Sequence, residues 1–263
     1  MAEENNEQVI EDDPIEVRRA KREALLAEGK NPYGHAAFEY SHHIVDLDEK
    51  YAELADGENT EDAVSIAGRV MAKRVQGKII FFELQDATGR IQLFCRINAL
   101  GEDAFAEMKD LDLGDWIGAH GLMMRTRRGQ LSVAVDSFQL LSKALRPLPE
   151  KFHGLNDKET RYRQRYVDLI VNDEVRDTFQ KRSKILSAFR RYMEADGYYE
   201  VETPILQTVQ GGATAKPFIT HFNALNQENY LRIATELHLK RLLVGGFERV
   251  FEIGRIFRNE GMD

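Results

Sequence analysis

The side chains best suited to chemistry lie in residues 247–260, which have the sequence FERVFEIGRIFRNE and are followed by a glycine. From residue 250 onward apolar and charged residues alternate, and this period of two predicts a strand with two different faces. The face that we expect to pack against a core consists of Phe251, Ile253 and Phe257. The opposite face consists of Glu252, Gly254, Arg258 and Glu260.

The second face suits a ligand that combines a nucleotide with an acid. Gly254 lets a ligand approach the backbone closely, and the planar fork of Arg258 matches a carboxylate or a phosphate. Glu260 can accept a hydrogen bond from an amine. A solvated strand face with an exposed Arg–Glu pair is the commoner arrangement on spacing alone, so both interpretations stay open at this point.

Elements upstream of this stretch must position it. Residues 173–196 predict a long helix that Gly197 ends, because apolar residues recur there at helical intervals. These residues are Phe179, Leu186, Phe189 and Met193. A strand follows in YYEVETPIL, residues 198–206, and Pro204 stops it. Residues 210–215, QGGATA, predict a flexible loop whose backbone can approach a ligand.

Residues 64–141 predict a barrel of short strands. We expect strands at residues 64–75, 78–85, 91–96, 116–125 and 131–141, and a helix over residues 99–109. Five strands with a helix after the third are the plan of an OB-fold, a small barrel that often holds single-stranded nucleic acid on one face.

The first three strands carry the candidate residues for contact with nucleic acid. A local positive field is expected from Arg69, Lys73, Arg74 and Lys78. Phe81 offers an aromatic surface, on which stacking of a base is worth about 1–3 kcal/mol, and Gln92 an amide that can bond to a base edge. Phe81 and Phe82 are adjacent, so one must face inward, and periodicity alone does not decide which.

The chain begins with twelve polar and acidic residues that we expect to be disordered. A helix is then predicted to about Glu28, with Asp13 as its N-cap, Pro14 in the first turn and Glu16 completing a capping box. The helix is basic through Arg18, Arg19, Lys21 and Arg22. These charges can lie against RNA phosphates or form a solvated face, and the second interpretation is slightly favoured.

Composition sets limits on the class of protein. With 263 residues, 43% of them hydrophobic and 30% charged, the chain has room for two domains. Its net charge of −8 argues against indiscriminate coating of nucleic acid. The single cysteine, Cys95, excludes an internal disulfide, and the histidines show no zinc spacing. Without a membrane-length apolar run or a signal-like start, a cytoplasmic location is expected.

The sequence EIGRIFRNEG, preceded by LRIATELHLKRLLVGGFERVF, closely resembles the second signature motif of class II aminoacyl-tRNA synthetases, in the form found in lysyl-tRNA synthetases. The resemblance extends upstream through KALRPLP, residues 143–149, to the NPY of residues 31–33. It implies an α+β protein in which an OB-fold β-barrel that binds the anticodon is followed by the first part of an antiparallel-sheet catalytic domain. The helix and strand of residues 173–206 resemble the first class II motif, which in the family forms the dimer interface.

The resemblance also implies roles for single residues. Arg258 would bridge the lysine carboxylate and the α-phosphate of ATP, and Glu260 would accept from the adenine amino group. Gly212 and Glu236 would hold the α-amino group of lysine. Phe81 and Gln92 would stack on and bond to anticodon uracils, with Arg69 and Arg74 beside them.

The activity expected from the resemblance is that of a lysine–tRNA ligase, which forms lysyl-adenylate from L-lysine and ATP and then charges tRNA(Lys). Magnesium should accompany the pyrophosphate, although the chain shows no identifiable ligands for it, and the complete protein should be a homodimer. The third class II motif lies outside this sequence, so we expect an N-terminal half that is inactive alone. Two alternatives stay open: a tRNA-binding module without catalysis, and a ligase of the aspartyl or asparaginyl type.

These expectations divide the chain into five segments. They are a disordered acidic tail (1–13), a helical extension (14–60), an OB-fold domain (61–143), a linker (144–160) and an incomplete catalytic domain (161–263).

Overall fold

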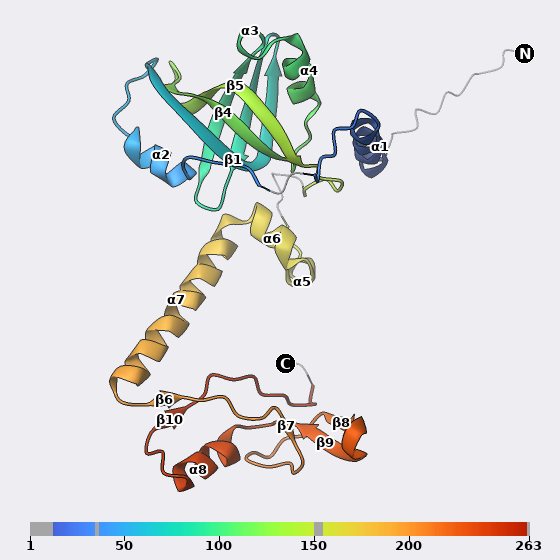
Figure 1. The fold of residues 1–263 in the computed structure, drawn as a ribbon, viewed down its shortest axis with the longest axis vertical. Helices are drawn as coiled ribbons and strands as arrows, with labels where there is room; N and C mark the ends of the chain where they lie inside the picture. The colour runs from blue at the N-terminus through green and yellow to red at the C-terminus, as the bar shows by residue number, and fades with distance from the viewer. Residues whose placement is uncertain (1–12, 35–36, 150–154, 262–263) are drawn as a thin grey trace, which may run out of the picture. The chain divides into compact units, whose positions relative to one another are not determined.

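The structure is a computed structural model that describes residues 13–34, 37–149 and 155–261. The chain forms two compact units, one within residues 1–163 and the other within residues 164–263 (Figure 1). The disorder expected for residues 1–12 lies outside the described residues, as does part of the expected linker.

The first unit is built around a closed five-stranded barrel in the order β1-β2-β3-β5-β4. Its strands are β1 (Asn59–Gln76), β2 (Ile79–Gln85), β3 (Arg90–Arg96), β4 (Trp116–Arg125) and β5 (Leu131–Ser142). Helices α3 (Ile97–Leu100) and α4 (Glu102–Asp110) follow β3. Among the barrel strands only β3 and β5 pair in parallel, and the antiparallel pairing of β4 with β1 closes the barrel. The predicted OB-fold is confirmed, with strand ends within a few residues of those expected.

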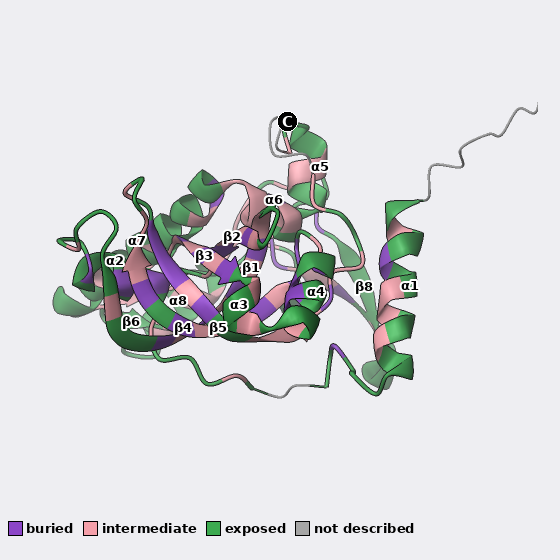
Figure 2. Ribbon diagram, turned by 90° about the horizontal axis from the view of Figure 1, so that it is seen from above, coloured by how far each residue is buried: buried purple, intermediate pink, exposed green. Residues whose placement is uncertain are grey.

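The barrel interior is filled by alternate residues of each strand, and Figure 2 shows the buried positions concentrated there. On β2, Ile80, Phe82 and Leu84 are buried, whereas Phe81 is half-buried on the outer side. The Phe82 side chain is 1% exposed. The structure thus decides between the adjacent phenylalanines: Phe82 belongs to the core, and Phe81 is available at the surface.

A β-bulge at Met71 changes which face the second half of β1 presents. Val70 pairs with Leu84 and Ala72 with Glu83, so Met71 is an extra residue without a partner on β2. An extra residue shifts the two-residue alternation by one. Because of this shift, Arg74 pairs with Phe81 and lies on the same outer face.

Cys95 on β3 points into the barrel and is 0% exposed. Burial raises the pKa of its thiol to about 12, because the interior disfavours the charged thiolate.

Three further helices belong to the first unit: α1 (Pro14–Ala27), α2 (Ile44–Lys50) and α5 (Lys158–Arg163). Asp13 caps α1 as expected, accepting from the Ile15 amide at 2.9 Å. Glu16 does not complete a capping box, because its carboxylate accepts instead from Arg19 at 2.6 Å.

Arg18 on α1 is not part of an exposed basic face. It is buried and donates to the backbone carbonyls of Leu113, Ala144 and Arg146 at 3.0, 3.2 and 3.3 Å. These bonds fasten α1 to the barrel and to the start of the proline-containing segment.

The second unit begins with helices α6 (Arg165–Val171) and α7 (Asp173–Ala195). Its other elements are β6 (Tyr199–Glu200), β7 (Leu206–Gln207), β8 (Ile219–Phe222), η1 (Asn223–Leu225), β9 (Gln227–Leu231), α8 (Glu236–Val244) and β10 (Val250–Phe251). Strands β7, β9 and β8 form an antiparallel sheet, and β6 pairs with β10 in parallel. The long helix is confirmed at its predicted bounds, and Gly197 follows it with a φ of 83°.

Two predicted strands are wrong in extent. Residues 198–206 contain β6 and the first residue of β7 rather than one strand, and residues 250–260 contain only the two residues of β10. Beyond β10 the backbone bonds to Arg232 and Lys216: Phe257 N donates to Arg232 O at 3.0 Å, and Asn259 N to Lys216 O at 2.7 Å. Without a continuous strand partner the predicted alternation is lost.

The two faces predicted for residues 250–260 are therefore also partly wrong. Phe251 is buried as expected, but Ile253 is 37% exposed. Glu252, which we expected on the ligand face, has a side chain only 4% exposed and paired with Arg232. No helix among the described residues is long and apolar enough to cross a membrane.

Candidate nucleic-acid interface and ligand-binding segment

A groove of about 960 Å³ lies on the barrel surface and brings together three of the six residues predicted to contact nucleic acid. Arg74, Phe81 and Gln92 all line it. They come from β1, β2 and β3, and strand pairing places Arg74 beside Phe81 and Phe81 beside Phe94. The surface therefore depends on how the three strands pair with one another and not on the sequence of a single strand.

The groove offers two aromatic rings side by side. The centroids of Phe81 and Phe94 are 5.4 Å apart, with their planes tilted by 36°. The guanidinium of Arg74 lies 4.9 Å from the centroid of Phe81, and that of Arg96 lies 5.4 Å from the centroid of Phe94. Cations at these distances are attracted by the ring face, so each ring is paired with a positive charge.

Phe94 and Arg96 also line the groove, although they were not predicted from the sequence. A signal was present, because Gln92, Phe94 and Arg96 alternate along one strand and must share a face once Gln92 is placed outward.

Arg69 lies away from this groove. Its guanidinium donates to Gly114 O at 2.9 Å and lies 5.2 Å from the Trp116 ring centroid, and burial lowers its pKa. Arg69 and Arg74 are five residues apart, about 16 Å along a strand at roughly 3.3 Å per residue. The structure does not bring Arg69 to Phe81, and its predicted contact with RNA stays a prediction.

The turn between β4 and β5 forms a cationic rim to the groove. Arg127 and Arg128 lie on this turn and are exposed. Arg125 holds the turn by donating to Gly129 O at 2.9 Å, and it donates to Tyr51 O at 2.8 Å. Five arginines and no carboxylate occur among the described residues that line the groove. A chain of net charge −8 thus presents a locally positive surface suited to a polyanion.

Gln92 is held at the floor of the groove by β5. Its Nε2 donates to Ser132 Oγ at 2.9 Å, and Ser132 Oγ donates to Gln130 O at 3.1 Å. Gln92 and Ser132 are register partners across the parallel β3–β5 pair. An amide, two aromatic rings and several guanidiniums therefore converge in one groove, which can stack bases and neutralise phosphates.

In the second unit, the predicted loop glycine and carboxylate lie together. Gly212 has a φ of 89°, and a Cβ there would lie 3.1 Å from Ala234 Cβ and 3.4 Å from Glu236 Cβ. A side chain at this position would therefore be strained in conformation and crowded. Glu236 is the first residue of α8, and its carboxylate accepts from Lys240 Nζ at 2.6 Å.

Arg258 and Glu260 lie on the irregular segment after β10. Glu260 Oε1 accepts from the Lys216 amide at 3.1 Å, which ties this segment to the chain after the glycine loop. Arg258 is exposed, and no hydrogen bond or ion pair within the described parts of the chain engages its guanidinium. The structure shows no contact of either residue with Gly212 or Glu236, and the four roles stay predictions.

Arg232 organises the segment that carries Arg258. Arg232 and Glu252 are each 4% exposed and pair at 2.5 Å between Nη1 and Oε1. Arg232 Nε also donates to Arg255 O at 2.9 Å. Burial raises the pKa of Glu252, but the hydrogen bond from Thr203 and the pairing with Arg232 outweigh it, and the net pKa is lowered. A Cβ at Gly254 would clash with the Arg232 guanidinium, so the close approach expected there is made by this arginine.

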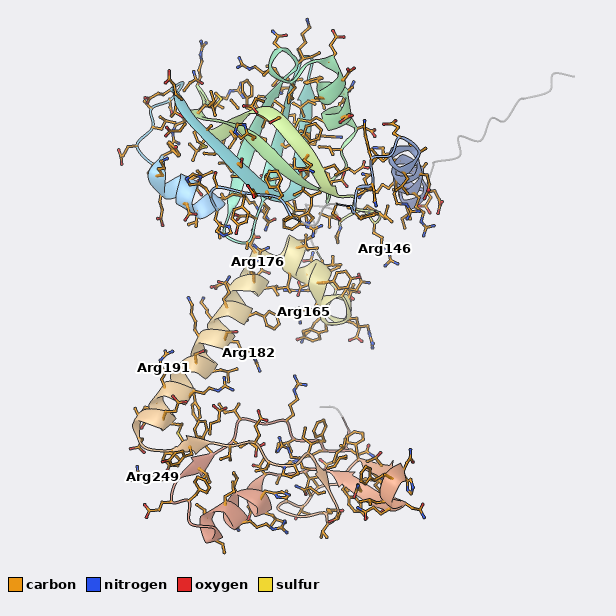
Figure 3. All side chains as sticks on the ribbon, viewed as in Figure 1. Arg146, Arg165, Arg176, Arg182, Arg191 and Arg249 are labelled. Atoms are coloured by element: carbon orange, nitrogen blue, oxygen red, sulfur yellow. The ribbon has the colours of Figure 1, made fainter. Side chains whose placement is uncertain are left out.

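Other arginines of the second unit are structural or solvent-facing rather than part of one cluster. Arg176, Arg182 and Arg191 project from α7 at different heights (Figure 3). Arg249 donates to Asp196 O at the end of α7. Among the residues that the structure describes, no group of three or more His, Cys, Asp or Glu could hold a metal ion.

Comparison with known families gives the class of this protein. Residues 64–141 match the family described as OB-fold nucleic acid binding domain, and residues 157–263 match the family described as tRNA synthetases class II (D, K and N). The chain belongs to the class II tRNA synthetases.

Within that class the chain is similar to lysine–tRNA ligases. It is 56% identical over 250 residues to the lysine–tRNA ligase of Thermosynechococcus vestitus, a match that covers 93% of this chain and 49% of that protein. It is 52% identical over 264 residues to the enzyme of Oceanobacillus iheyensis, covering 100% and 52%. The chloroplastic/mitochondrial lysine–tRNA ligase of Arabidopsis thaliana is 54% identical, covering 94% and 41%. The chain spans about half the length of the curated relatives it matches.

Proposed function

We propose that the whole protein is a lysine–tRNA ligase, and that this chain supplies its anticodon-binding barrel and part of its catalytic domain. The observation that carries the proposal is the groove of neighbouring aromatic rings and guanidiniums on the barrel of a chain similar throughout its length to lysine–tRNA ligases.

On the RNA side, Phe81 receives an anticodon uracil and Gln92 bonds to its edge. Stacking of one base on an aromatic ring is worth about 1–3 kcal/mol. Arg127 and Arg128 on the rim neutralise backbone phosphates, so binding should weaken as salt rises. Phe94 adds a second ring beside the first.

On the catalytic side, a carboxylate oxygen of L-lysine attacks the α-phosphorus of ATP, and the bond to pyrophosphate breaks. Two anions must meet in this step, and Arg258 is suited to bridge them because its guanidinium is exposed and unengaged among the described residues. A preorganised donor of this kind is worth about 3–4 kcal/mol in a transition state. In the second step a terminal tRNA hydroxyl attacks the lysyl carbonyl, and AMP leaves.

The remaining predicted contacts have local competitors. Glu236 would hold the α-amine of lysine in place of, or together with, the Lys240 ammonium that it now pairs with at 2.6 Å. Gly212 would bring backbone groups to the same amine. Glu260 would accept from the adenine amino group while the Lys216 amide occupies one of its oxygens.

Three further expectations stay part of this proposal: magnesium, a homodimer and a cytoplasmic location. Magnesium would accompany the pyrophosphate of ATP, but the described residues offer no carboxylate cluster for it, and no step above depends on a metal site. A homodimer through the first class II motif and a cytoplasmic location are likewise predictions.

The test is RNA binding by the 263-residue chain, measured by fluorescence anisotropy with a labelled anticodon hairpin that carries UUU in its loop. A hairpin of the same stem with an unrelated loop is the matched control. We expect at least tenfold tighter binding of the UUU loop, and equal affinities would contradict the proposal. For the whole protein, lysine must be charged in preference to aspartate or asparagine, which separates the proposal from the related ligases.

A further inference from the structure

The Gln92 amide could in principle turn either end toward the groove. With Nε2 outward it would donate a hydrogen bond to a base, and with Oε1 outward it would accept one. The two orientations have nearly the same shape, so only the neighbouring hydrogen bonds can distinguish them. Which end faces the groove decides which bases Gln92 can bond to.

Ser132 supplies the distinguishing hydrogen bonds. Its hydroxyl proton is directed at Gln130 O, 3.1 Å away, and a carbonyl can only accept. With its proton used in this way, Ser132 Oγ can only accept from Gln92, and Nε2 lies 2.9 Å from it. Turning the amide around would require the hydroxyl to leave Gln130 O, so the reversed arrangement has one hydrogen bond fewer.

Gln130 O is itself fixed by the turn. It accepts from the Thr126 amide at 2.9 Å, which closes the loop between β4 and β5. Ser132 is fully buried, and strand pairing places it beside Gln92. The chain of hydrogen bonds therefore runs from Gln92 Nε2 to Ser132 Oγ and on to Gln130 O. Its last member is a backbone carbonyl, which can only accept. No hydrogen bond among the described residues takes up Gln92 Oε1.

We propose that Ser132 is a positioning residue for base recognition, which turns the Gln92 amide so that Oε1 faces the groove and accepts from the ring N–H on the pairing edge of the bound base. Uracil and guanine carry such an N–H, at N3 and N1 respectively. Cytosine and adenine carry a lone pair at the corresponding place, which Oε1 repels. The inference rests on the proposed RNA-binding function and adds the origin of its base preference.

The experiment uses the 263-residue chain and four anticodon hairpins in anisotropy titrations. One hairpin carries UUU, and the other three carry a single U→C change at each of the three positions. We expect wild type to bind UUU tightest, with the largest loss at the position that Gln92 contacts. Ser132→Ala should reduce that U-over-C ratio by about five- to tenfold, since it removes the hydrogen bond that selects one orientation. Ser132→Thr keeps the hydroxyl and should restore the ratio.

A purely structural role of Ser132 predicts a different result. It would weaken binding of all four hairpins by the same factor and leave the U-over-C ratio at its wild-type value, which would overturn the proposal. Phe81→Ala tests the underlying RNA-binding function separately from the role of Ser132. Loss of binding to every hairpin is expected, and unchanged affinities would refute the RNA-binding groove itself.

A second variant keeps the test decisive if Ser132→Ala does not fold. Gln92→Glu places an acceptor oxygen at either end of the side chain, so it should keep the preference for U whatever the orientation. If wild-type Gln92 instead offers Nε2 to the groove, Gln92→Glu must change the sign or the position of the preference, and the proposal fails. Combined with Ser132→Ala, Gln92→Glu should restore the U-over-C ratio that the single serine variant loses.

Discussion

The barrel and the second unit fix their candidate sites in different ways. In the barrel, one continuous core of buried side chains from all five strands sets the register, and the groove residues follow from it. In the described part of the second unit few apolar residues are buried: Val175, Ile233 and Phe251, together with Pro217. There a single buried ion pair, Arg232–Glu252, shapes the backbone that carries Arg258.

A surface built by strand register tolerates change at its outer residues, whereas a segment shaped by one polar contact depends on that contact. Many apolar side chains share the stability of the barrel, while the loss of one charge leaves its buried partner without compensation.

The largest effect is expected from the barrel core. Phe82→Ala should lower the free energy of unfolding of the barrel by about 3–5 kcal/mol, because it leaves a cavity in a closed core. Phe81→Ala is the matched control, since it removes the same side chain from the neighbouring, outward position, and should cost about 1 kcal/mol or less. Urea unfolding followed by the fluorescence of Trp116, the only tryptophan, reports on the barrel. Equal losses of unfolding free energy in the two variants would contradict the placement of Phe82 inside the barrel and Phe81 outside it.

A similar loss is expected from one charge in the second unit. Arg232→Met should cost about 3–5 kcal/mol, because Glu252 is left buried without its partner. Replacing both residues by apolar ones should cost less than the single change. Far-UV circular dichroism measures the unfolding, with Trp116 fluorescence recorded in parallel to identify the barrel transition. A double variant as unstable as the single one would show that the ion pair is not the organising contact.

RNA binding should depend on an outer residue of the barrel. Phe81→Ala is expected to weaken binding of the UUU hairpin by about 1–3 kcal/mol, or roughly 5- to 150-fold, by removing a stacking surface. Leu113→Ala, which removes an exposed apolar side chain of the same unit outside the groove, is the control and should leave the affinity within twofold.

Acid should weaken the second unit through Glu252. Its folded pKa lies below the ordinary value of 4.5, so its stabilising contribution is present above that value and is lost as the pH falls through the folded pKa. Glu252→Gln should therefore be less stable than wild type at neutral pH, and the difference should shrink as the pH falls below 4.5. Thermal unfolding followed by circular dichroism across this range measures it. A constant difference would contradict the assigned ionisation.

The smallest effect is expected in the salt dependence of RNA binding. Arg128→Ala should reduce the slope of log K against log salt by about 0.7, the value for one phosphate contact to a single strand. Arg22→Ala on α1 tests the alternative that the N-terminal helix also touches RNA, and its slope should equal that of wild type. A reduced slope in this variant would favour the RNA-contact interpretation of α1.

The barrel could be predicted because local signals agreed with the tertiary structure. Alternation, glycine turns and the helix after the third strand led to the correct strands. The choice between Phe81 and Phe82 needed the register, since both positions suit a strand. The bulge at Met71 left no pattern in the sequence, yet it brings Arg74 to Phe81.

The segment after β10 could not be predicted in this way. Its alternation was compatible with a strand, but Arg232, about twenty residues earlier in the chain, takes the hydrogen bonds that a strand partner would need. Gly212 and Glu236 were recognised by family resemblance rather than by periodicity, and their proximity follows from the loop folding back onto the start of α8. Contacts between residues far apart in the sequence determine the backbone conformation of such regions, and local periodicity contains no information about those contacts.

The single buried cysteine makes the rate of barrel opening measurable. Cys95 is inaccessible and its pKa is about 12, so an alkylating reagent can react with it only while the barrel is transiently open. The labelling rate of the unmodified protein, followed by mass spectrometry, therefore measures how often the strands separate. Slower labelling in the presence of an RNA hairpin would show, without any substitution, that the ligand holds those strands together.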